Sequence, residues 1–248
     1  INNAYFIKVS CCHMSRFLTQ LDPDSIQFPS PRHALTEPNG LLAIGGDLSP
    51  QRLLLAYHNG IFPWYGAHHP ILWWSPNPRG VLPPEHVHVS RSMQKLRRNH
   101  PYEIWINRNF MATVRACAAP RRDCDDTWIN EELMASYAQL HDSGYAHSVE
   151  VWQNDALIGG LYGISIGRVF CGESMFSRVV NTSKLALVEF CNHFNSHGGR
   201  LIDCQMQTEH LASLGVIDWP REQFLQSLYQ LRDQHLDKSC WHRQQIGL

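Results

Sequence analysis

Charged side chains are scarce in this chain of 248 residues, at 17% of the total, against roughly 25% in an average soluble domain. Basic and acidic residues nearly balance, at 21 and 22, and leave a formal net charge of −1. Aromatic residues reach 10% and include eight Trp. So few charges and so many aromatic side chains exclude a disordered or coiled-coil protein. A uniformly basic nucleic-acid coat protein is excluded as well, whereas a local basic patch is not.

Three further absences narrow the class of protein to which the chain can belong. No apolar run approaches the roughly 18 residues of a membrane-spanning helix, so we expect no membrane association. No P-loop and no GxGxxG motif occurs, which argues against a nucleotide cofactor held by those devices. The eight cysteines form no CxxC pair and several lie inside apolar runs, as small hydrophobic residues do. We therefore expect reduced thiols and a cytoplasmic protein.

The start of the chain differs from the rest. Residues 1–13 have neither a basic segment nor a long apolar segment, and Met14 resembles a natural start, so we expect residues 1–13 to be a leader outside the fold. Residues 61–84 carry many prolines and three Trp, and this proline density predicts a connection without a regular helix. We expect a small N-terminal domain over 14–77 and a larger domain over 78–248.

The larger domain alternates between strand and helix patterns. Asn154-Asp155 between two apolar runs predicts a tight turn. The predicted strands are 102–106, 146–152, 156–163, 168–176 and 200–206. Two helices are predicted over 91–99, a basic stretch, and over 109–118. Three more helices are predicted: one capped by Asn130, one capped by Thr182 or Ser183 and ended by Gly198, and one opened by Pro220. This order predicts an α+β fold with a mainly antiparallel sheet covered by helices.

Two strands carry acids in apolar surroundings. In the strand 200–206, alternation puts Leu201, Asp203 and Gln205 on one face. A buried Asp203 needs a partner or a shifted pKa, but a solvated sheet face explains the pattern as well. In 170–176, Glu173 is the single charge; it either serves a site or pairs with Arg178 at the end of the strand.

Two catalytic motifs are present only in part. The segment Gly163–Gly167 matches GxSxG, but that nucleophile elbow needs a helix directly after the serine. The strand pattern that follows predicts a hairpin, so a serine hydrolase is not expected. His193 and His197 share a helix face, yet no third ligand is apparent in the sequence, so we expect no metal site.

A basic face is predicted on the helix 91–99. Its cations are Arg91, Lys95, Arg97 and Arg98. Such a face could bind several phosphates, although most charge runs are simply solvated. Trp residues in neighbouring segments, Trp64 and Trp128 among them, favour nucleic acid because indole rings stack on unpaired bases.

Five motifs in order along the chain carry a resemblance to a known family. They are Pro38–Pro50 (PNGLLAIGGDLSP), Gly60–Trp64 (GIFPW), Ile71–Pro76 (ILWWSP), Cys171–Arg178 (CGESMFSR) and Leu201–Gln205 (LIDCQ). Together they resemble the bacterial leucyl/phenylalanyl-tRNA–protein transferases. The resemblance implies transfer of Leu or Phe from aminoacyl-tRNA to the N-terminal Arg or Lys of a protein, which marks that protein for N-end-rule degradation. It also implies a larger domain similar to GNAT acetyltransferases and no metal or other cofactor, because the tRNA ester is already activated.

The resemblance assigns roles to matching positions. Asp203 and Gln205 match the catalytic carboxylate and amide, Glu173 matches the acceptor-site acid, and Trp64 and Trp128 match the aromatic residues at the terminal adenosine. The pocket for the transferred side chain matches Leu161, Phe170, Met175, Leu187 and Phe194, with Ser196 near its rim. An apolar pocket discriminates weakly between apolar side chains, so Met is also expected. We expect a monomer.

Two competing hypotheses stay open, an acyl-CoA-dependent N-acetyltransferase and a non-catalytic RNA-binding module. Neither requires all the features above, since the first needs no basic face and the second needs no buried acid. The resemblance also makes a structural prediction. Regular alternation puts Phe170 and Met175 on opposite faces of one strand, so a shared pocket requires a bulge or twist at Gly172.

Overall fold

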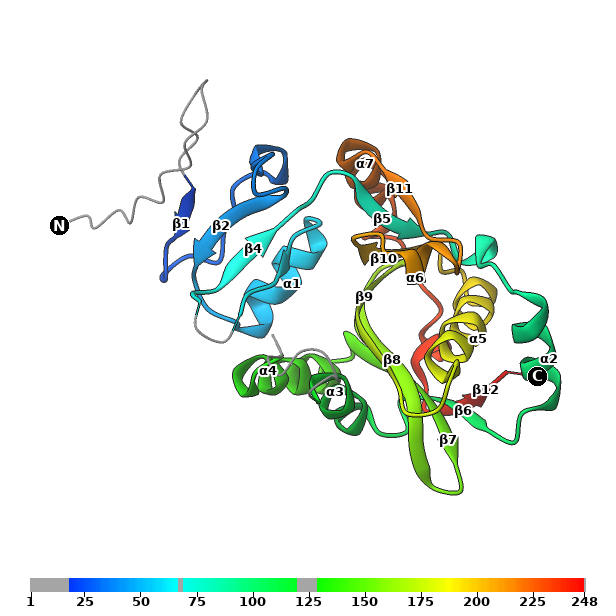
Figure 1. The fold of residues 1–248 in the computed structure, drawn as a ribbon. Helices are drawn as coiled ribbons and strands as arrows, with labels where there is room; N and C mark the ends of the chain where they lie inside the picture. Colours follow the sequence, from blue (N-terminus) through cyan, green and yellow to red (C-terminus); the bar gives the residue numbers. More distant parts are fainter. Residues whose placement is uncertain (1–17, 67–68, 120–128, 248) are drawn as a thin grey trace.

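The computed structural model describes residues 18–66, 69–119 and 129–247, which form two β-sheets with helices between and around them (Figure 1). Trp128 and the expected leader over 1–13 lie outside the described residues. No helix in the described part of the chain is long and apolar enough to cross a bilayer.

The N-terminal sheet has four short strands in the order β1-β2-β4-β3. Its elements are β1 (Thr19–Leu21), β2 (Leu41–Gly45), β3 (Phe62–Pro63) and β4 (Leu72–Trp74), accompanied by η1 (Pro31–His33) and α1 (Pro50–His58). Ser49 caps α1 by accepting a hydrogen bond from the Arg52 amide, a role that Ser commonly takes before a Pro at the first helical position. The strands were not predicted, because runs of two to five residues show little periodicity.

The second sheet has eight strands in the order β11-β5-β10-β9-β8-β7-β6-β12. They are β5 (Arg79–Leu82), β6 (Glu103–Ile106), β7 (Ala146–Gln153), β8 (Ala156–Ile166), β9 (Val169–Ser177), β10 (Leu201–Gln205), β11 (Ile217–Trp219) and β12 (Gln244–Ile246). Every neighbouring pair is antiparallel except β9 and β10, which are parallel. The predicted α+β fold with a mainly antiparallel sheet is confirmed.

The predicted helices are present, but the cap of one was predicted wrongly and the short helix α6 (Glu209–Ala212) was not predicted. The helices that follow β5 along the chain are α2 (Arg91–Asn99), α3 (Phe110–Ala118), α4 (Glu131–Asp142), α5 (Thr182–Ser196), α6 and α7 (Arg221–Leu231), with short turns η2 (Pro84–His86) and η3 (Lys238–Trp241). Asn130 caps α4 as predicted. The predicted cap of α5 is wrong: the residue before the helix is Asn181, with φ of 68°. The hydroxyl of Thr182 donates instead to backbone carbonyls.

Two hydrophobic cores lie on the two faces of the eight-stranded sheet. The first joins the sheet to the N-terminal sheet and to α1, α3, α4 and α7, and includes Trp73 and Phe224. The second lies under α5 and α2 and includes Phe170 and Phe194. Because the first core contains side chains from both sheets, the N-terminal unit packs directly on the larger one. The division at residue 77 stays a prediction.

Candidate active site

The sheet opens between β9 and β10. These two parallel strands pair only from Leu201 opposite Val169 to Asp203 opposite Cys171. Both strands continue beyond that point, β9 to Ser177 and β10 to Gln205. Polar side chains placed just past the last pair can therefore meet in the gap, where backbone groups are free of the ladder.

A bulge in β9 brings Glu173 into this gap. Opposite β9, Tyr162 pairs with Ser174 and the next residue, Gly163, pairs with Gly172, so Glu173 is the extra residue. A bulge of this kind reverses which face later residues occupy. Accordingly, Phe170 and Met175 both pack against the second core. The irregularity predicted at Gly172 is confirmed.

Glu173 is the centre of a buried hydrogen-bond chain. The side-chain amide of Gln205 donates to Oε1 of Glu173 at 2.9 Å, and the Tyr137 hydroxyl donates to Oε2 of Glu173 at 2.7 Å. The hydroxyls of Tyr137 and Tyr57 are 3.0 Å apart, and since the Tyr137 proton points to Glu173, Tyr57 is the donor of that bond. The alternative partner Arg178 instead donates to the carbonyl of Leu157.

Burial dominates the acidity of Glu173. Loss of water raises its pKa from the ordinary 4.5 to about 7, because a carboxylate is poorly stabilised away from solvent. The nearby charge of Asp203 adds to this rise, whereas the hydrogen bonds from Tyr137 and Gln205 oppose it. A carboxyl group with this pKa can gain or lose a proton at neutral pH, which suits contact with an amine.

Asp203 lies in a fully buried ion pair. Its two oxygens accept from Nε and Nη2 of Arg79, both at 2.7 Å, and each residue is 1% exposed. Arg79 also donates to the carbonyl of Gly60 at 3.1 Å. Its guanidinium group lies over the rings of Phe62 and Phe224. The buried partner that the sequence required is therefore Arg79, and the solvated-face alternative is wrong.

Asp203 also holds the backbone of Gln205. The Gln205 amide N–H donates to Asp203 Oδ1 at 3.0 Å, and the register of β10 against β5 shifts between these residues. Gln205 has φ of 63°, a left-handed conformation that costs about 1–3 kcal/mol outside glycine. The Arg79–Asp203 pair thus fixes a strained turn that aims the Gln205 side chain at Glu173.

The expected amino-acid pocket lies on the other face of the sheet. Leu161, Phe170, Met175, Leu187 and Phe194 all belong to the second core or pack against it. Gly163 makes room for the Phe170 ring, because a methyl group there would lie 2.7 Å from its Cζ. Ser196 stays outside this group: it is exposed, and its hydroxyl donates to the carbonyl of His193.

Comparison with known proteins matches this chain to one family. The family model for leucyl/phenylalanyl-tRNA protein transferase matches residues 81–229, and the model for the N-terminal domain of that family matches 46–77. The leucyl/phenylalanyl-tRNA–protein transferase of Aeromonas hydrophila is 58% identical over 235 residues, covering 95% of this chain and 100% of that protein. The chain belongs to the leucyl/phenylalanyl-tRNA–protein transferase family. The enzyme of the same description from Tolumonas auensis is 57% identical over 95% of this chain and 100% of its own.

Membership in the transferase family makes the chain an aminoacyltransferase, as its motifs predicted. Among solved structures, a GCN5-related N-acetyltransferase from Kribbella flavida is similar with a TM-score of 0.36 and 11% identity, over 66% of this chain and 58% of that one. L-PGS from Bacillus licheniformis reaches a TM-score of 0.34 at 9% identity, over 79% and 63%. Scores this low support no structural conclusion.

Of the expected tRNA contacts, Trp64, Arg91, Lys95 and Arg98 are exposed, and Trp128 lies outside the described residues. Trp64 is 44% exposed, with its ring edge-to-face with Trp74 at 5.7 Å. On α2, Arg91, Lys95 and Arg98 are exposed and form no ion pair with any residue that the structure describes. The fourth cation, Arg97, differs because it is paired with the buried Glu189 of α5.

Three buried residues of the site were missed from the sequence. Arg79 contacts Asp203, Tyr137 contacts Glu173, and Tyr57 contacts Tyr137, each from another element. A lone cation inside the apolar, proline-rich segment 61–84 was a usable signal for Arg79, whereas the tyrosines look like ordinary core residues. Ser165 of the GxSxG motif lies within β8, and β9 follows as the second strand of a hairpin, so the expected hairpin is confirmed.

Proposed function

We propose that this chain transfers Leu, Phe or Met from aminoacyl-tRNA to the N-terminal Arg or Lys of acceptor proteins, and so marks them for N-end-rule degradation. The observation that carries the proposal is the 2.9 Å hydrogen bond between Gln205 and Glu173 across the gap between β9 and β10. An amide and an acid meet there beside a carboxylate, Asp203, that is already neutralised by Arg79.

The reaction requires the free amine of the acceptor to attack the ester carbonyl of the charged tRNA. The ammonium group of the acceptor first loses one proton to solvent. The free amine then forms the peptide bond as the ester C–O bond to the terminal ribose breaks, and a second proton of the amine ends on the ribose oxygen, which leaves as a hydroxyl. Glu173, with its pKa of about 7, attracts the cationic N-terminus. Gln205 directs an amide at the reacting centre, where a fixed donor stabilises developing negative charge. Asp203 acts through Gln205 and is a positioning residue.

The substrates fit the surroundings of this site. The core side chains around Phe170 are apolar, which suits Leu, Phe and Met and discriminates between them by only about 1–3 kcal/mol per methylene. The exposed ring of Trp64 offers a stacking surface for the terminal adenosine. The resemblance assigns the same role to Trp128. Arg91, Lys95 and Arg98 supply cations for tRNA phosphates.

The proposed setting follows from the chemistry. Cys171, Cys191, Cys204 and Cys240 are all free thiols, which supports a reducing compartment such as the cytoplasm. The acyl ester of the tRNA is already activated, so the proposed transfer consumes no ATP. We propose that the chain acts as a monomer, which sedimentation of the purified enzyme checks.

One assay tests the proposal. The enzyme is incubated with Phe-tRNA and a peptide that begins with Arg, without coenzyme A, and the products are identified by mass spectrometry. We expect the peptide to gain one Phe at its N-terminus, and the same peptide with an acetylated N-terminus to gain none. Acetyl transfer from acetyl-coenzyme A instead would favour the N-acetyltransferase, and tRNA binding without any product would favour the RNA-binding module.

A further inference from the structure

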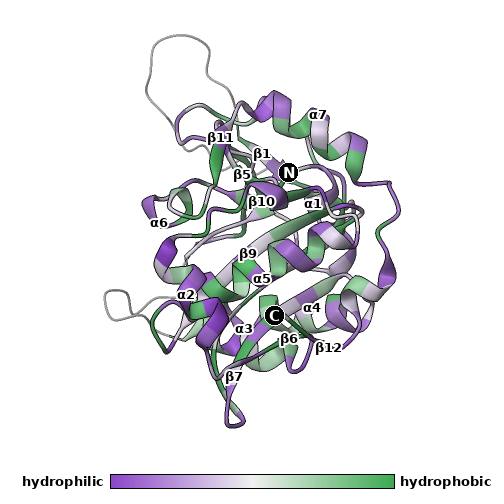
Figure 2. Ribbon diagram, turned by 90° about the vertical axis from the view of Figure 1, so that its right-hand side faces the viewer, coloured by the Kyte–Doolittle hydropathy of each residue, from purple (hydrophilic) through white to green (hydrophobic). Residues whose placement is uncertain are grey.

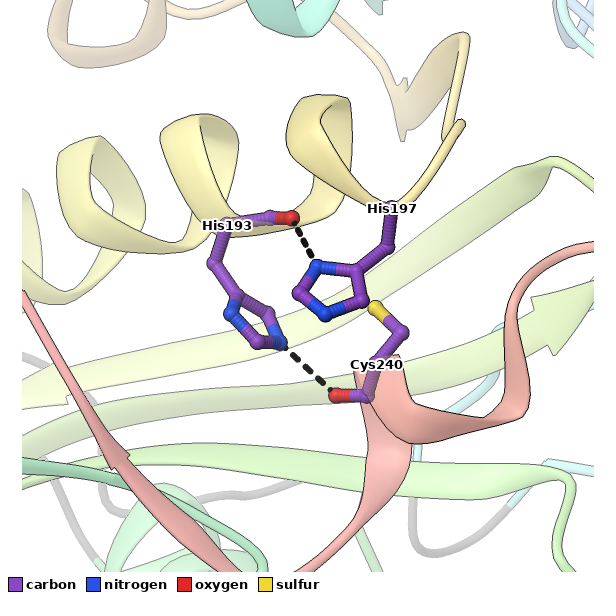
Figure 3. A group of neighbouring side chains, drawn as sticks. All are labelled: His193, His197 and Cys240. Carbon is purple, nitrogen blue, oxygen red and sulfur yellow. Dashed lines mark hydrogen bonds between the residues drawn. The ribbon is translucent and has the colours of Figure 1, made fainter.

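The last turn of α5 carries two histidines one helical turn apart, and the structure adds the third residue that the sequence did not supply. Cys240, in η3, lies against His193 and His197 (Figure 3). One ligand atom from each residue falls within 4.8 Å of the other two. The two imidazole rings have centroids 4.2 Å apart. The cluster joins the C-terminal segment to the end of α5.

The hydrogen bonds of the cluster prepare His197 to bind a metal. Its Nδ1 is 2.7 Å from the backbone carbonyl of His193, and because a carbonyl only accepts, Nδ1 carries the proton. Nε2 of His197 therefore has the free lone pair that a metal requires, and the ring orientation is fixed by the other nitrogen. The hydroxyl of Ser196 donates to the same carbonyl at 2.7 Å.

The donor set decides which metal fits. Two imidazoles and one thiolate are ligands for zinc, whereas magnesium and calcium require oxygen ligands, and the cluster contains no carboxylate. Three protein ligands leave the fourth tetrahedral position to solvent. His193 and His197 are partly exposed, so an ion has a path to the cluster. The cluster also lies at the C-terminal end of α5, where the helix dipole favours a cation.

We propose that His193, His197 and Cys240 bind one Zn²⁺ ion that ties the C-terminal segment to α5. On binding, the sulfur–hydrogen bond of Cys240 is replaced by a sulfur–zinc bond, and the proton passes to solvent. Both histidines bind as neutral imidazoles, so no redox change occurs. His193 Nε2 is 2.8 Å from the carbonyl of Cys240, so Nε2 carries the ring proton before the ion binds. Binding through Nε2 moves this proton to Nδ1, and the ion replaces the hydrogen bond as the link between the two segments.

The site has a structural consequence for the second core. Trp241, the residue after Cys240, stacks on His147 with ring centroids 4.0 Å apart and lies 5.6 Å from the Phe170 ring. Fixing Cys240 therefore fixes Trp241 against the aromatic side chains of this core. We expect zinc to stabilise the fold, because an ion that binds only the native state shifts the unfolding equilibrium. Binding itself does not depend on the proposed transfer reaction.

The test is a titration of metal-free, full-length enzyme with Co²⁺, followed by displacement with Zn²⁺. Thiolate ligation gives Co²⁺ a charge-transfer absorption that imidazole or carboxylate ligands do not give. We expect one Co²⁺ per chain with this absorption, its loss on adding Zn²⁺, and a higher unfolding temperature with Zn²⁺. Cys240→Ala and His197→Gln should each weaken Zn²⁺ binding by at least about tenfold.

The matched control is Cys191→Ala, which removes another buried thiol from α5 outside the cluster. This variant should keep the charge-transfer absorption and the zinc-dependent rise in unfolding temperature. If Cys240→Ala does not fold, the absorption of the unmodified enzyme and of His197→Gln still decides the question. Absence of the thiolate absorption in the unmodified enzyme, or an unchanged affinity for Co²⁺ in His197→Gln, would overturn the proposal.

Discussion

The carboxylate of Asp203 receives both arms of the Arg79 guanidinium, at 2.7 Å each, and neither residue is more than 1% exposed. The same carboxylate accepts the backbone N–H of Gln205. Asp203 is therefore already occupied by protein groups and is poorly placed to contact a substrate. Its effect on the reaction passes through the conformation of Gln205. The Arg79–Asp203 pair therefore contributes directly to the stability of the fold and indirectly, through Gln205, to activity.

Replacing Asp203 tests the ion pair. Asp203→Asn is nearly isosteric but leaves the buried charge of Arg79 without its counter-charge, so we expect the free energy of unfolding to fall by about 3–5 kcal/mol. Urea unfolding followed by circular dichroism measures this loss. The control is Asp218→Asn, an exposed acid on β11, which should change the free energy by less than about 0.5 kcal/mol. Equal effects of the two substitutions would contradict the buried ion pair.

Gln205→Gly separates chemistry from folding. Glycine adopts the left-handed conformation of this position without strain, so relief of strain offsets the loss of the hydrogen bond to Glu173. We expect the free energy of unfolding to stay within about 1 kcal/mol of the unmodified enzyme. The rate of Phe transfer should nevertheless fall at least about tenfold, which corresponds to ~1.4 kcal/mol in the barrier. Full activity in a stable Gln205→Gly variant would remove Gln205 from the mechanism.

Glu173 makes stability depend on pH. Its folded pKa is about 7, raised above the ordinary 4.5, so between these values the folded state binds more protons than the unfolded state. The stability contribution of this group is complete below pH 4.5 and is lost as the pH rises through 7. The change amounts to up to about 3 kcal/mol. Glu173→Gln should remove it, which unfolding measured at pH 4.5, 6 and 7.5 will show.

The matched control for this experiment is Glu209→Gln, an exposed acid at the start of α6. Its pH profile should follow that of the unmodified enzyme. Transfer activity gives a second readout, because a carboxylate that attracts the cationic acceptor must be ionised. We expect the unmodified enzyme to gain activity as the pH rises through 7, and Glu173→Gln to be slow and to keep only the rise at higher pH that deprotonation of the acceptor amine gives. An unchanged pH profile in Glu173→Gln would show that Glu173 does not control the reaction.

The local part of this fold could be predicted from the sequence. The strands β7, β8 and β9 show strong apolar patterns, and Asn154-Asp155 forms the turn between the first two with φ of 48° and 62°. The bulge beside Gly172 could be predicted only by combining strand alternation with the residues that the resemblance assigns to one pocket. That combination works because a strand has two faces and a bulge is the simplest way to exchange them.

The distant partners could not be predicted. Arg79 is 124 residues before Asp203 in the sequence, and no pattern near either residue identifies the other. Tyr137 reaches Glu173 from one helix and Tyr57 reaches Tyr137 from another, and Cys240 approaches His193 from a segment 47 residues later. Such contacts arise from the packing of whole elements, so sequence periodicity, which reports one element at a time, does not contain them.

The basic face of α2 divides into cations with different roles. Arg91, Lys95 and Arg98 are exposed, whereas Arg97 holds α2 to the buried Glu189 of α5. Much of the α2 ribbon has the colour of hydrophilic residues in Figure 2. Reversing the three exposed charges to Glu should raise the Michaelis constant for Phe-tRNA. The logarithm of this Michaelis constant should also depend less steeply on the logarithm of the salt concentration. The slope should fall by about one unit for each phosphate that the variant no longer binds. Steady-state kinetics at several salt concentrations measure both quantities.

A short aminoacyl-adenosine substrate is the control for this prediction, because it lacks the distant phosphates. The triple variant should use it as well as the unmodified enzyme does. Arg97→Glu should behave differently: it places a second acid beside Glu189, which is 3% exposed, and like charges in a buried site destabilise the fold. We therefore expect a lower unfolding temperature and an equal decrease in activity on both substrates. An equal decrease in the triple variant too would mean that the whole face serves folding and not tRNA.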